Sequence, residues 1–223
     1  MITEGRLNDS KRNTISLVRE IGLLGNFNNQ VIYPDNMPSQ LRQLSYESAW
    51  KKHKKNFWFD IELDDSSLLI FKQNGYSYIR VPFSTLSFSD FAAEYYEDDP
   101  EWQDEENKHI IAEEYEKYLS SSLEKQPPMP VRFDIDSTYY CEHVHPLYHF
   151  HFGIENESRI PSNRELMPLS FTAFILRTFY PKEWKNFVLS DGINKYLPQF
   201  KENLTIVPND YWTETEAKLF YLG

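Results

Sequence analysis

Two short runs of acidic and imidazole side chains are the part of this sequence best suited to chemistry. Asp134 and Asp136 alternate with apolar residues, and His149 and His151 alternate with aromatic residues a short distance further on. Carboxylates and imidazoles are the ligand types of zinc, manganese and iron. A carboxylate can also orient an imidazole that acts as a general base. The pattern therefore predicts either a divalent-metal site or an acid–base pair.

Both runs have the alternation of a half-buried β-strand, with apolar residues at every second position of 131–136 and of 148–154. The segment between them is short enough to join neighbouring antiparallel strands. Any register that keeps the aromatic residues together then places an acid beside a histidine on one sheet face. A second interpretation stays open, in which this polar row is solvated or lies under a helix where each imidazole is satisfied by an acid or a backbone carbonyl.

A longer signature extends from the histidines into an apolar segment with helical spacing. Its residues are His145-Pro146, His149, Gly153, Arg159-Ile160-Pro161, Pro168, Phe171, Phe174-Ile175-Leu176-Arg177 and Phe179-Tyr180. This pattern resembles the H-P-x-x-H-x-x-x-G, R-I-P and P-x-x-F-x-x-F-I-L-R-x-F-Y signature of an uncharacterised bacterial protein family. The resemblance implies no reaction, but it implies a setting among bacterial mobile-element and antiviral-defence proteins. The position of His151 is often not His in that signature, so the resemblance favours the pair Asp134 and His149.

Two functions are consistent with these residues. The first is a non-catalytic or regulatory subunit of a bacterial multiprotein system, which the acidic surface, the abundant Tyr and Trp and the lack of a complete catalytic motif favour. It predicts a stable protein partner. The second is a metal-dependent hydrolase or nuclease, in which Asp134, His149 and Arg159 are catalytic and Asp136 and His151 hold the metal. The only cofactor that this sequence suggests is a divalent metal.

The composition limits the class of protein. The 223 residues are 40% hydrophobic and 16% aromatic, enough to bury a sizeable core. A net charge of −11 opposes broad capture of nucleic acid, because Lys and Arg dominate affinity for phosphate. We expect nucleic-acid contact only through a partner or through Lys51–Lys55, the one basic run, whose alternative reading is a solvated helix face. No apolar run approaches the ~20 residues that span a bilayer, and with one Cys and no signal-peptide core we expect a cytoplasmic protein.

The predicted fold class is α+β, in the order helix, meander, helices, hairpin, helices. Asn74-Gly75 is the strongest hairpin signal in the chain. We expect one domain over 1–223, with a helical segment over 1–55 and closing helices over 168–223. A parallel sheet would need strands that alternate with helices, which the sequence lacks, so we expect an antiparallel sheet of about five strands packed against helices.

Local sequence patterns also predict where several helices begin and end. Ser10 is the expected N-cap of the first helix and Gly25 its stop. Thr213-x-x-Glu216 is a capping box for a final helix that ends near Leu222.

Overall fold

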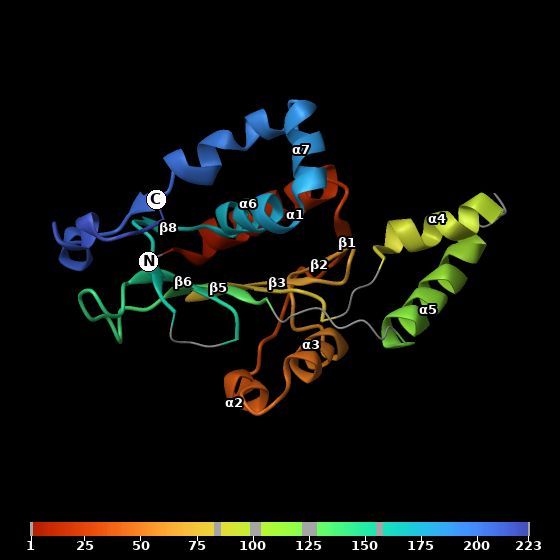
Figure 1. Cartoon of the computed structure of the whole chain (residues 1–223), viewed down its shortest axis with the longest axis horizontal. Helices are drawn as coiled ribbons and strands as arrows, with labels where there is room; N and C mark the ends of the chain where they lie inside the picture. Colours follow the sequence, from red (N-terminus) through yellow and green to blue (C-terminus); the bar gives the residue numbers. More distant parts are fainter. Residues whose placement is uncertain (1, 83–85, 99–103, 122–128, 155–157, 223) are drawn as a thin grey trace. The chain divides into compact units, whose positions relative to one another are not determined.

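The computed structural model describes residues 2–82, 86–98, 104–121, 129–154 and 158–222 (Figure 1). Its internal contacts divide the chain into two compact units. The first unit comprises Met1–Leu24, Leu69–Ile79 and Met129–Gly223, and the second comprises Gly25–Leu68 and Arg80–Pro128. None of the helices that the structure describes is long and apolar enough to cross a membrane.

The fold is α+β, as the sequence predicts, but the sheet is larger than expected. In the described part of the chain, seven strands rather than about five form one antiparallel sheet in the order β1-β2-β3-β4-β5-β6-β7, and β8 pairs with β9 in a second, small sheet. The strands missed by the count are short, and a two-residue strand has no alternation to detect. The strands are β1 (Leu24–Phe27), β2 (Ile61–Leu63), β3 (Leu68–Lys72), β4 (Gly75–Ile79), β5 (Val131–Ile135), β6 (Tyr148–Phe152), β7 (Ile160–Pro161), β8 (Arg164–Glu165) and β9 (Thr205–Ile206).

Strand β5 lies at the centre of the first unit and pairs antiparallel with β4 and β6. Its register on β6 sets Phe133 opposite Phe150 and Asp134 opposite His149. This register confirms that the two alternating runs pair and that Asp134 shares a face with the histidines. On the other side of β5, Gly75 faces Asp134. A Cβ atom on Gly75, which has φ +154°, would lie 2.6 Å from the carbonyl oxygen of Phe133, so only glycine fits there.

The other face of these strands is apolar and packs against α6 (Pro168–Phe179). The ring centroid of Phe171 lies 5.8 Å from that of Tyr76, and the ring centroid of Phe174 lies 5.2 Å from that of Phe150. Pro168 occupies the first turn of α6, where the missing N–H costs no hydrogen bond. Helix α1 (Glu4–Glu20) lies beside α6 (Figure 1). The core of this unit is therefore formed by the apolar face of the sheet and α6, and the polar row is left on the opposite face.

Several predicted helix ends are wrong. Helix α1 is capped by Thr3, whose Oγ1 accepts a hydrogen bond from the backbone N–H of Arg6. Ser10 is buried inside the helix, where its Oγ accepts a hydrogen bond from the backbone N–H of Leu169. The chain leaves α1 at Gly22, with φ +83°, rather than at Gly25. The Ser10 prediction failed because a buried serine that bonds a neighbouring helix looks the same in sequence as a cap, whereas Gly25 belongs to strand β1.

The predicted capping box at the end of the chain forms only in part. Thr213 Oγ1 accepts a hydrogen bond from the backbone N–H of Glu216, as a cap does. Only a short 3₁₀ turn, Glu216–Lys218, follows instead of a helix. Preceding it in the first unit are α7 (Pro181–Leu189) and the turns Gly192–Lys195, Pro198–Glu202 and Asn209–Tyr211.

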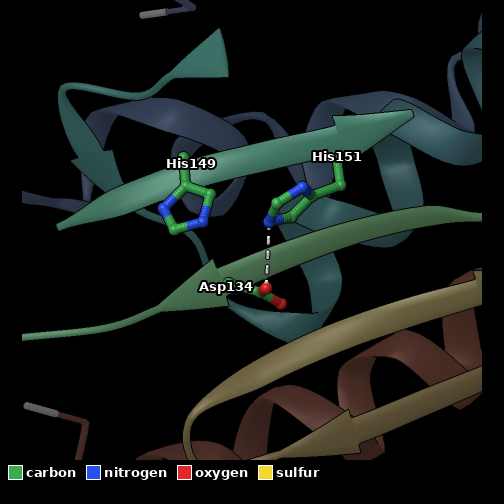
Figure 2. A group of neighbouring side chains, drawn as sticks. All are labelled: Asp134, His149 and His151. Carbon is green, nitrogen blue, oxygen red and sulfur yellow. Dashed lines mark ion pairs between the residues drawn. The ribbon is translucent and has the colours of Figure 1, made fainter. Parts of the chain in front are cut away.

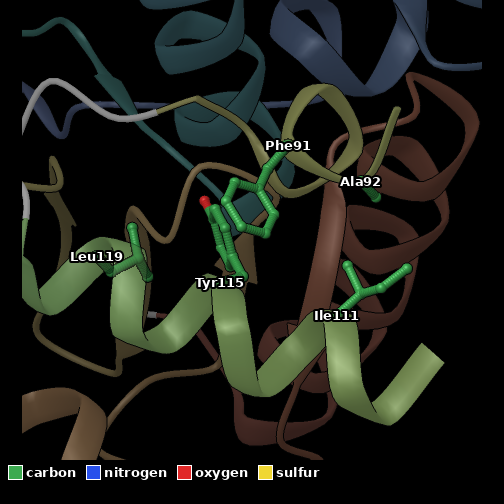
Figure 3. Close-up of a cluster of buried hydrophobic side chains, with 5 residues drawn as sticks. All are labelled: Phe91, Ala92, Ile111, Tyr115 and Leu119. Atoms are coloured by element: carbon green, nitrogen blue, oxygen red, sulfur yellow. The ribbon is translucent and has the colours of Figure 1, made fainter. Parts of the chain in front are cut away.

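The second unit has a core of its own between two helices. Phe91 and Ala92 on one helix pack against Ile111, Tyr115 and Leu119 on the next (Figure 3). Apolar residues at helical spacing thus bury one face of each helix. The helices of this unit are α2 (Met37–Leu41), α3 (Tyr46–Lys55), α4 (Phe88–Asp98) and α5 (Glu105–Ser121).

Candidate metal centre

Three side chains of the polar row point toward one another, Asp134 from β5 and His149 and His151 from β6 (Figure 2). His149 is directly opposite Asp134, and His151 follows two residues later on the same face. The Nε2 atom of His151 lies 3.2 Å from Oδ2 of Asp134. Each residue offers one ligand atom that lies within 4.8 Å of the ligand atoms of the other two. The three side chains therefore converge on one small space.

The two imidazoles are buried, and the carboxylate is the accessible member of the group. His149 is 0% exposed and His151 is 3% exposed, whereas 34% of the Asp134 side chain is exposed. A small molecule or ion would therefore approach from the side of Asp134.

The position of the proton on His149 is determined by the backbone. Its Nδ1 atom lies 2.7 Å from the carbonyl oxygen of Pro146. A carbonyl only accepts hydrogen bonds, so Nδ1 carries the hydrogen and Nε2 keeps a lone pair. The Nε2 atom is buried and has no hydrogen-bond partner among the described residues. Burial lowers the pKa of His149 to about 4, so the ring is neutral at pH 7 and its lone pair is available.

Asp134 is held in its charged form by its neighbours. Burial raises the pKa of this carboxyl, but the hydrogen bond from His151 and the charge of Arg132 outweigh burial and lower the pKa below its ordinary value. The Arg132 guanidinium lies 3.4 Å from Oδ2 of Asp134. His151 also has a buried Nδ1 atom without a hydrogen-bond partner in the described part of the chain.

Two imidazole nitrogens and one carboxylate oxygen are a donor set used for zinc and for divalent iron. The residues present fit such an ion, because a buried ring nitrogen of His149 with a lone pair and an ionised carboxylate face the same space. Coordination by Nε2 of His151 replaces its hydrogen bond to Asp134 and moves its hydrogen to Nδ1. Three protein ligands also leave coordination positions for water or substrate.

The other two predicted site residues lie beside this group. Asp136 follows the end of β5, and its Oδ1 atom accepts hydrogen bonds from the backbone N–H groups of Thr138 and Tyr139 at 2.9 and 3.1 Å. Its Oδ2 atom lies 3.7 Å from Nε2 of His145. Arg159 is half-buried. It lies close enough to His145 for its positive charge to lower the pKa of that histidine, although burial lowers this pKa more. The His145 ring in turn lies 4.9 Å from the His149 ring.

Sequence reasoning did not identify two contributors to this site. The Pro146 carbonyl orients His149, but a backbone acceptor has no side-chain signature, and its only cue is the His-Pro-x-x-His spacing. Arg132 also has no distinctive signature, because a charged residue that alternates along a strand looks the same in sequence whether it faces solvent or a carboxylate. Neither residue is a proposed metal ligand, but each one orients or charges a residue that is.

A comparison with models of protein families gives a match over most of the chain. The model of a family described as "Uncharacterized conserved protein (DUF2290)" matches residues 21–222. The chain belongs to this family. The matched range contains every residue of the candidate site, and it confirms the resemblance to an uncharacterised family without assigning a reaction. Searches of curated proteins and of solved structures found no match.

Proposed function

We propose that this protein is a metal-dependent hydrolase whose divalent ion is held by Asp134, His149 and His151. The observation that carries the proposal is the buried Nε2 lone pair of His149, which has no partner in the described residues and faces an ionised carboxylate. Leaving a buried polar atom unsatisfied costs about 1–3 kcal/mol. A bound ion satisfies that atom, which supports a ligand role over a purely structural one.

The residues around the ligands have separate tasks in this proposal. A divalent ion bound at this site supplies Lewis-acid activation of water. The Pro146 carbonyl keeps the Nδ1 hydrogen in place, so that Nε2 of His149 always faces the ligand space. Arg132 keeps Asp134 ionised. Arg159 is the group assigned to an anionic part of the substrate, because its guanidinium can form paired hydrogen bonds with a carboxylate or phosphate.

The first experiment is elemental analysis of the purified protein, followed by titration with Zn²⁺, Mn²⁺ and Fe²⁺. We expect about one equivalent of ion per chain and a rise in melting temperature on binding. His149→Ala should lose the bound ion. His109→Ala is the matched control, because His109 is an exposed histidine on α5 and should leave binding unchanged. Failure of all three ions to bind would contradict the proposal.

Hydrolysis itself is tested with model esters. Protein loaded with the ion that binds should cleave an activated phosphodiester such as bis-p-nitrophenyl phosphate, and His149→Ala should not. Arg159→Lys keeps the charge but removes the paired donors, so it should raise KM more than it lowers kcat. A protein that binds metal with no esterase or phosphodiesterase activity would support a metal site without hydrolysis.

A second candidate function is a non-catalytic subunit of a bacterial multiprotein system of the defence type that the resemblance implies. The supporting observation is the loop between β5 and β6, where Tyr139 and Val144 are 70% and 66% exposed. Exposed aromatic and aliphatic side chains on an ordered loop are common at the centre of protein interfaces. The cytoplasmic location that this function requires is consistent with the single, exposed cysteine, Cys141.

Affinity purification of the tagged chain from its native host tests this second candidate. A stoichiometric partner should copurify, and the double change Tyr139→Ser with Val144→Ser should release it. Phe220→Ser is the control, because Phe220 is 77% exposed but lies on a different segment. Retention of the partner by the loop variant, or absence of any stoichiometric partner, would contradict this role.

A further inference from the structure

The second unit contains a cavity of about 460 Å³ beside the last turn of α3. Small-molecule sites commonly measure about 300–1,000 Å³, so this volume suits a ligand of modest size. Its lining combines aromatic rings with the basic run of the sequence, namely Trp50, Phe57, Lys51, Lys54 and Lys55. The only strongly basic run of an acidic chain therefore faces a cavity instead of only covering a helix.

Phe57 occupies a backbone position that does not favour it. The backbone N–H of Phe57 bonds the carbonyl of Lys54 at 3.1 Å, and that of Trp58 bonds the carbonyl of His53 at 3.0 Å. This pair of bonds is the helix-ending motif whose left-handed residue is usually glycine. Here that residue is Phe57, with φ +53°. A phenylalanine in this conformation costs free energy that a glycine would not.

The Phe57 side chain does not recover this cost by burial. It is 59% exposed, and its ring centroid lies 6.1 Å from that of Phe59. The ring is thus held at the edge of the cavity by a strained backbone, with much of its surface open to solvent. Strain that packing does not explain is a mark of a functional position. The open ring face offers a stacking surface for a planar group.

The charges around the cavity fall into two sets. The Lys54 ammonium lies 2.9 Å from Glu62 and 3.2 Å from Glu116, and 5.4 Å from the centroid of the Trp50 ring. The charge of Lys54 is therefore neutralised by these two acids, and Lys51 is paired with Glu47 at 2.9 Å. Lys55 is exposed and forms no ion pair with any residue that the structure describes, and it lies two positions before Phe57. The available positive charge is therefore next to the available ring.

We propose that this cavity binds a nucleotide unit, with its base stacked on Phe57 and its phosphate paired with Lys55. Bases stack on exposed aromatic side chains without regard to sequence, and a lysine ammonium pairs with phosphate as a point charge. The carboxylates of Glu62 and Glu116 supply acceptors for base N–H groups. The nucleotide unit is either a free mononucleotide or part of a single strand. The site lies in the second unit and does not depend on the metal centre of the first.

Two probes distinguish the two sources of the nucleotide. Adenosine 5′-monophosphate is titrated by calorimetry, and a short fluorescein-labelled oligothymidylate is titrated by fluorescence anisotropy. Binding of the mononucleotide supports a free ligand, and binding of the oligonucleotide alone supports a strand. Absence of binding by both probes at low salt overturns the proposal.

Phe57→Gly is the decisive variant, because glycine suits the left-handed backbone. We expect its melting temperature to equal or exceed that of the wild type, while its affinity for the probe falls by about tenfold. Phe220→Gly removes another exposed phenyl ring and should leave binding unchanged. Wild-type affinity in Phe57→Gly would overturn the stacking role, whatever the effect on stability.

Lys55→Gln tests the phosphate contact. We expect weaker binding of the oligonucleotide and a salt dependence whose logarithmic slope is smaller by about 0.7, the value for one phosphate contact on a single strand. Lys182→Gln, at an exposed position on α7, is the matched control for the loss of one positive charge. An unchanged slope in Lys55→Gln would overturn the assignment of this lysine.

Discussion

The Nδ1 atom of His149 lies 2.7 Å from the carbonyl oxygen of Pro146, three residues earlier in the chain. This contact makes the tautomer of His149 a property of the backbone. The His-Pro-x-x-His spacing therefore positions a ring nitrogen as well as shaping a loop. Because the other nitrogen faces Asp134 and His151, the proposed ligand space is formed before any ion arrives.

Asp134→Asn should abolish the stabilisation by metal and should also lower the stability of the metal-free protein, because the amide loses the charge interactions with Arg132 and His151. The amide has nearly the volume of the carboxylate, and the side chain is only half-buried, but the amide is a poor metal ligand. At one hundred times Kd, a bound ion stabilises the wild type by about 2.7 kcal/mol. Differential scanning fluorimetry with and without the ion measures both effects. A metal-dependent shift that persists in Asp134→Asn would remove Asp134 from the ligand set.

Asp136→Asn separates the two predicted acids. An amide oxygen can still accept the backbone hydrogen bonds from Thr138 and Tyr139, so the turn should survive. In the same assay, we expect the full stabilisation by metal to remain. Loss of the shift in this variant would support the sequence-based assignment of Asp136 as a ligand.

The stability of the metal-free protein should fall on acidification below pH 6.5. The folded-state pKa of His149 is lowered to about 4, so between these pH values the unfolded chain binds a proton that the folded chain excludes. The lowered pKa of Asp134 adds a loss of stability at still lower pH, below the ordinary range of a carboxyl. Urea unfolding at a series of pH values measures the slope. His149→Gln should flatten it between pH 4 and 6.5, and an equally steep slope in that variant would contradict the assignment.

Phe171→Ala should cost about 3–5 kcal/mol of unfolding free energy, because the ring is fully buried between the sheet and α6. Phe174→Ala should cost less, since the Phe174 side chain is only partly buried. Chemical denaturation of both variants gives the two values. A larger loss for Phe174 than for Phe171 would mean that the helix faces the sheet with a different side.

Glu216→Ala should loosen the loop that carries His143. The buried Glu216 carboxylate accepts hydrogen bonds from the backbone N–H of His143, at 3.2 Å, and from its Nδ1, at 2.8 Å. His143 has φ +61°, so this loop depends on an external contact to keep its shape. Hydrogen exchange should accelerate at the His143 amide and not in β5. Unchanged protection at His143 would show that other contacts hold the loop.

The sequence predicts the pairing of β5 with β6 because alternation is a local property that survives into the fold. Asp134 and Asp136 have the same parity, yet only Asp134 joins the histidines. Asp136 lies one residue beyond β5, where its carboxylate bonds the following turn. Alternate residues share a face only as far as the strand extends. The end of β5 is determined by the turn that follows it, so alternation alone could not place Asp136. The number of strands was underestimated for a similar reason. Strand β7 has only two residues and is a strand because it pairs with β6, which its local sequence cannot show.

Gly75 ties the turn of one hairpin to the chemistry of a distant segment. It lies opposite Asp134, and a side chain on it would collide with the backbone that holds this carboxylate. Variation at the Asn74-Gly75 turn is therefore not independent of variation at the candidate ligands. In a mutational library, substitutions at positions 75 and 134 should therefore have similar effects on metal binding. A substitution chosen to alter the turn at Gly75 would also displace the Asp134 carboxylate. A recombinant of two diverged homologues should keep its function only when it inherits the Asn74-Gly75 turn and strand β5 from the same parent.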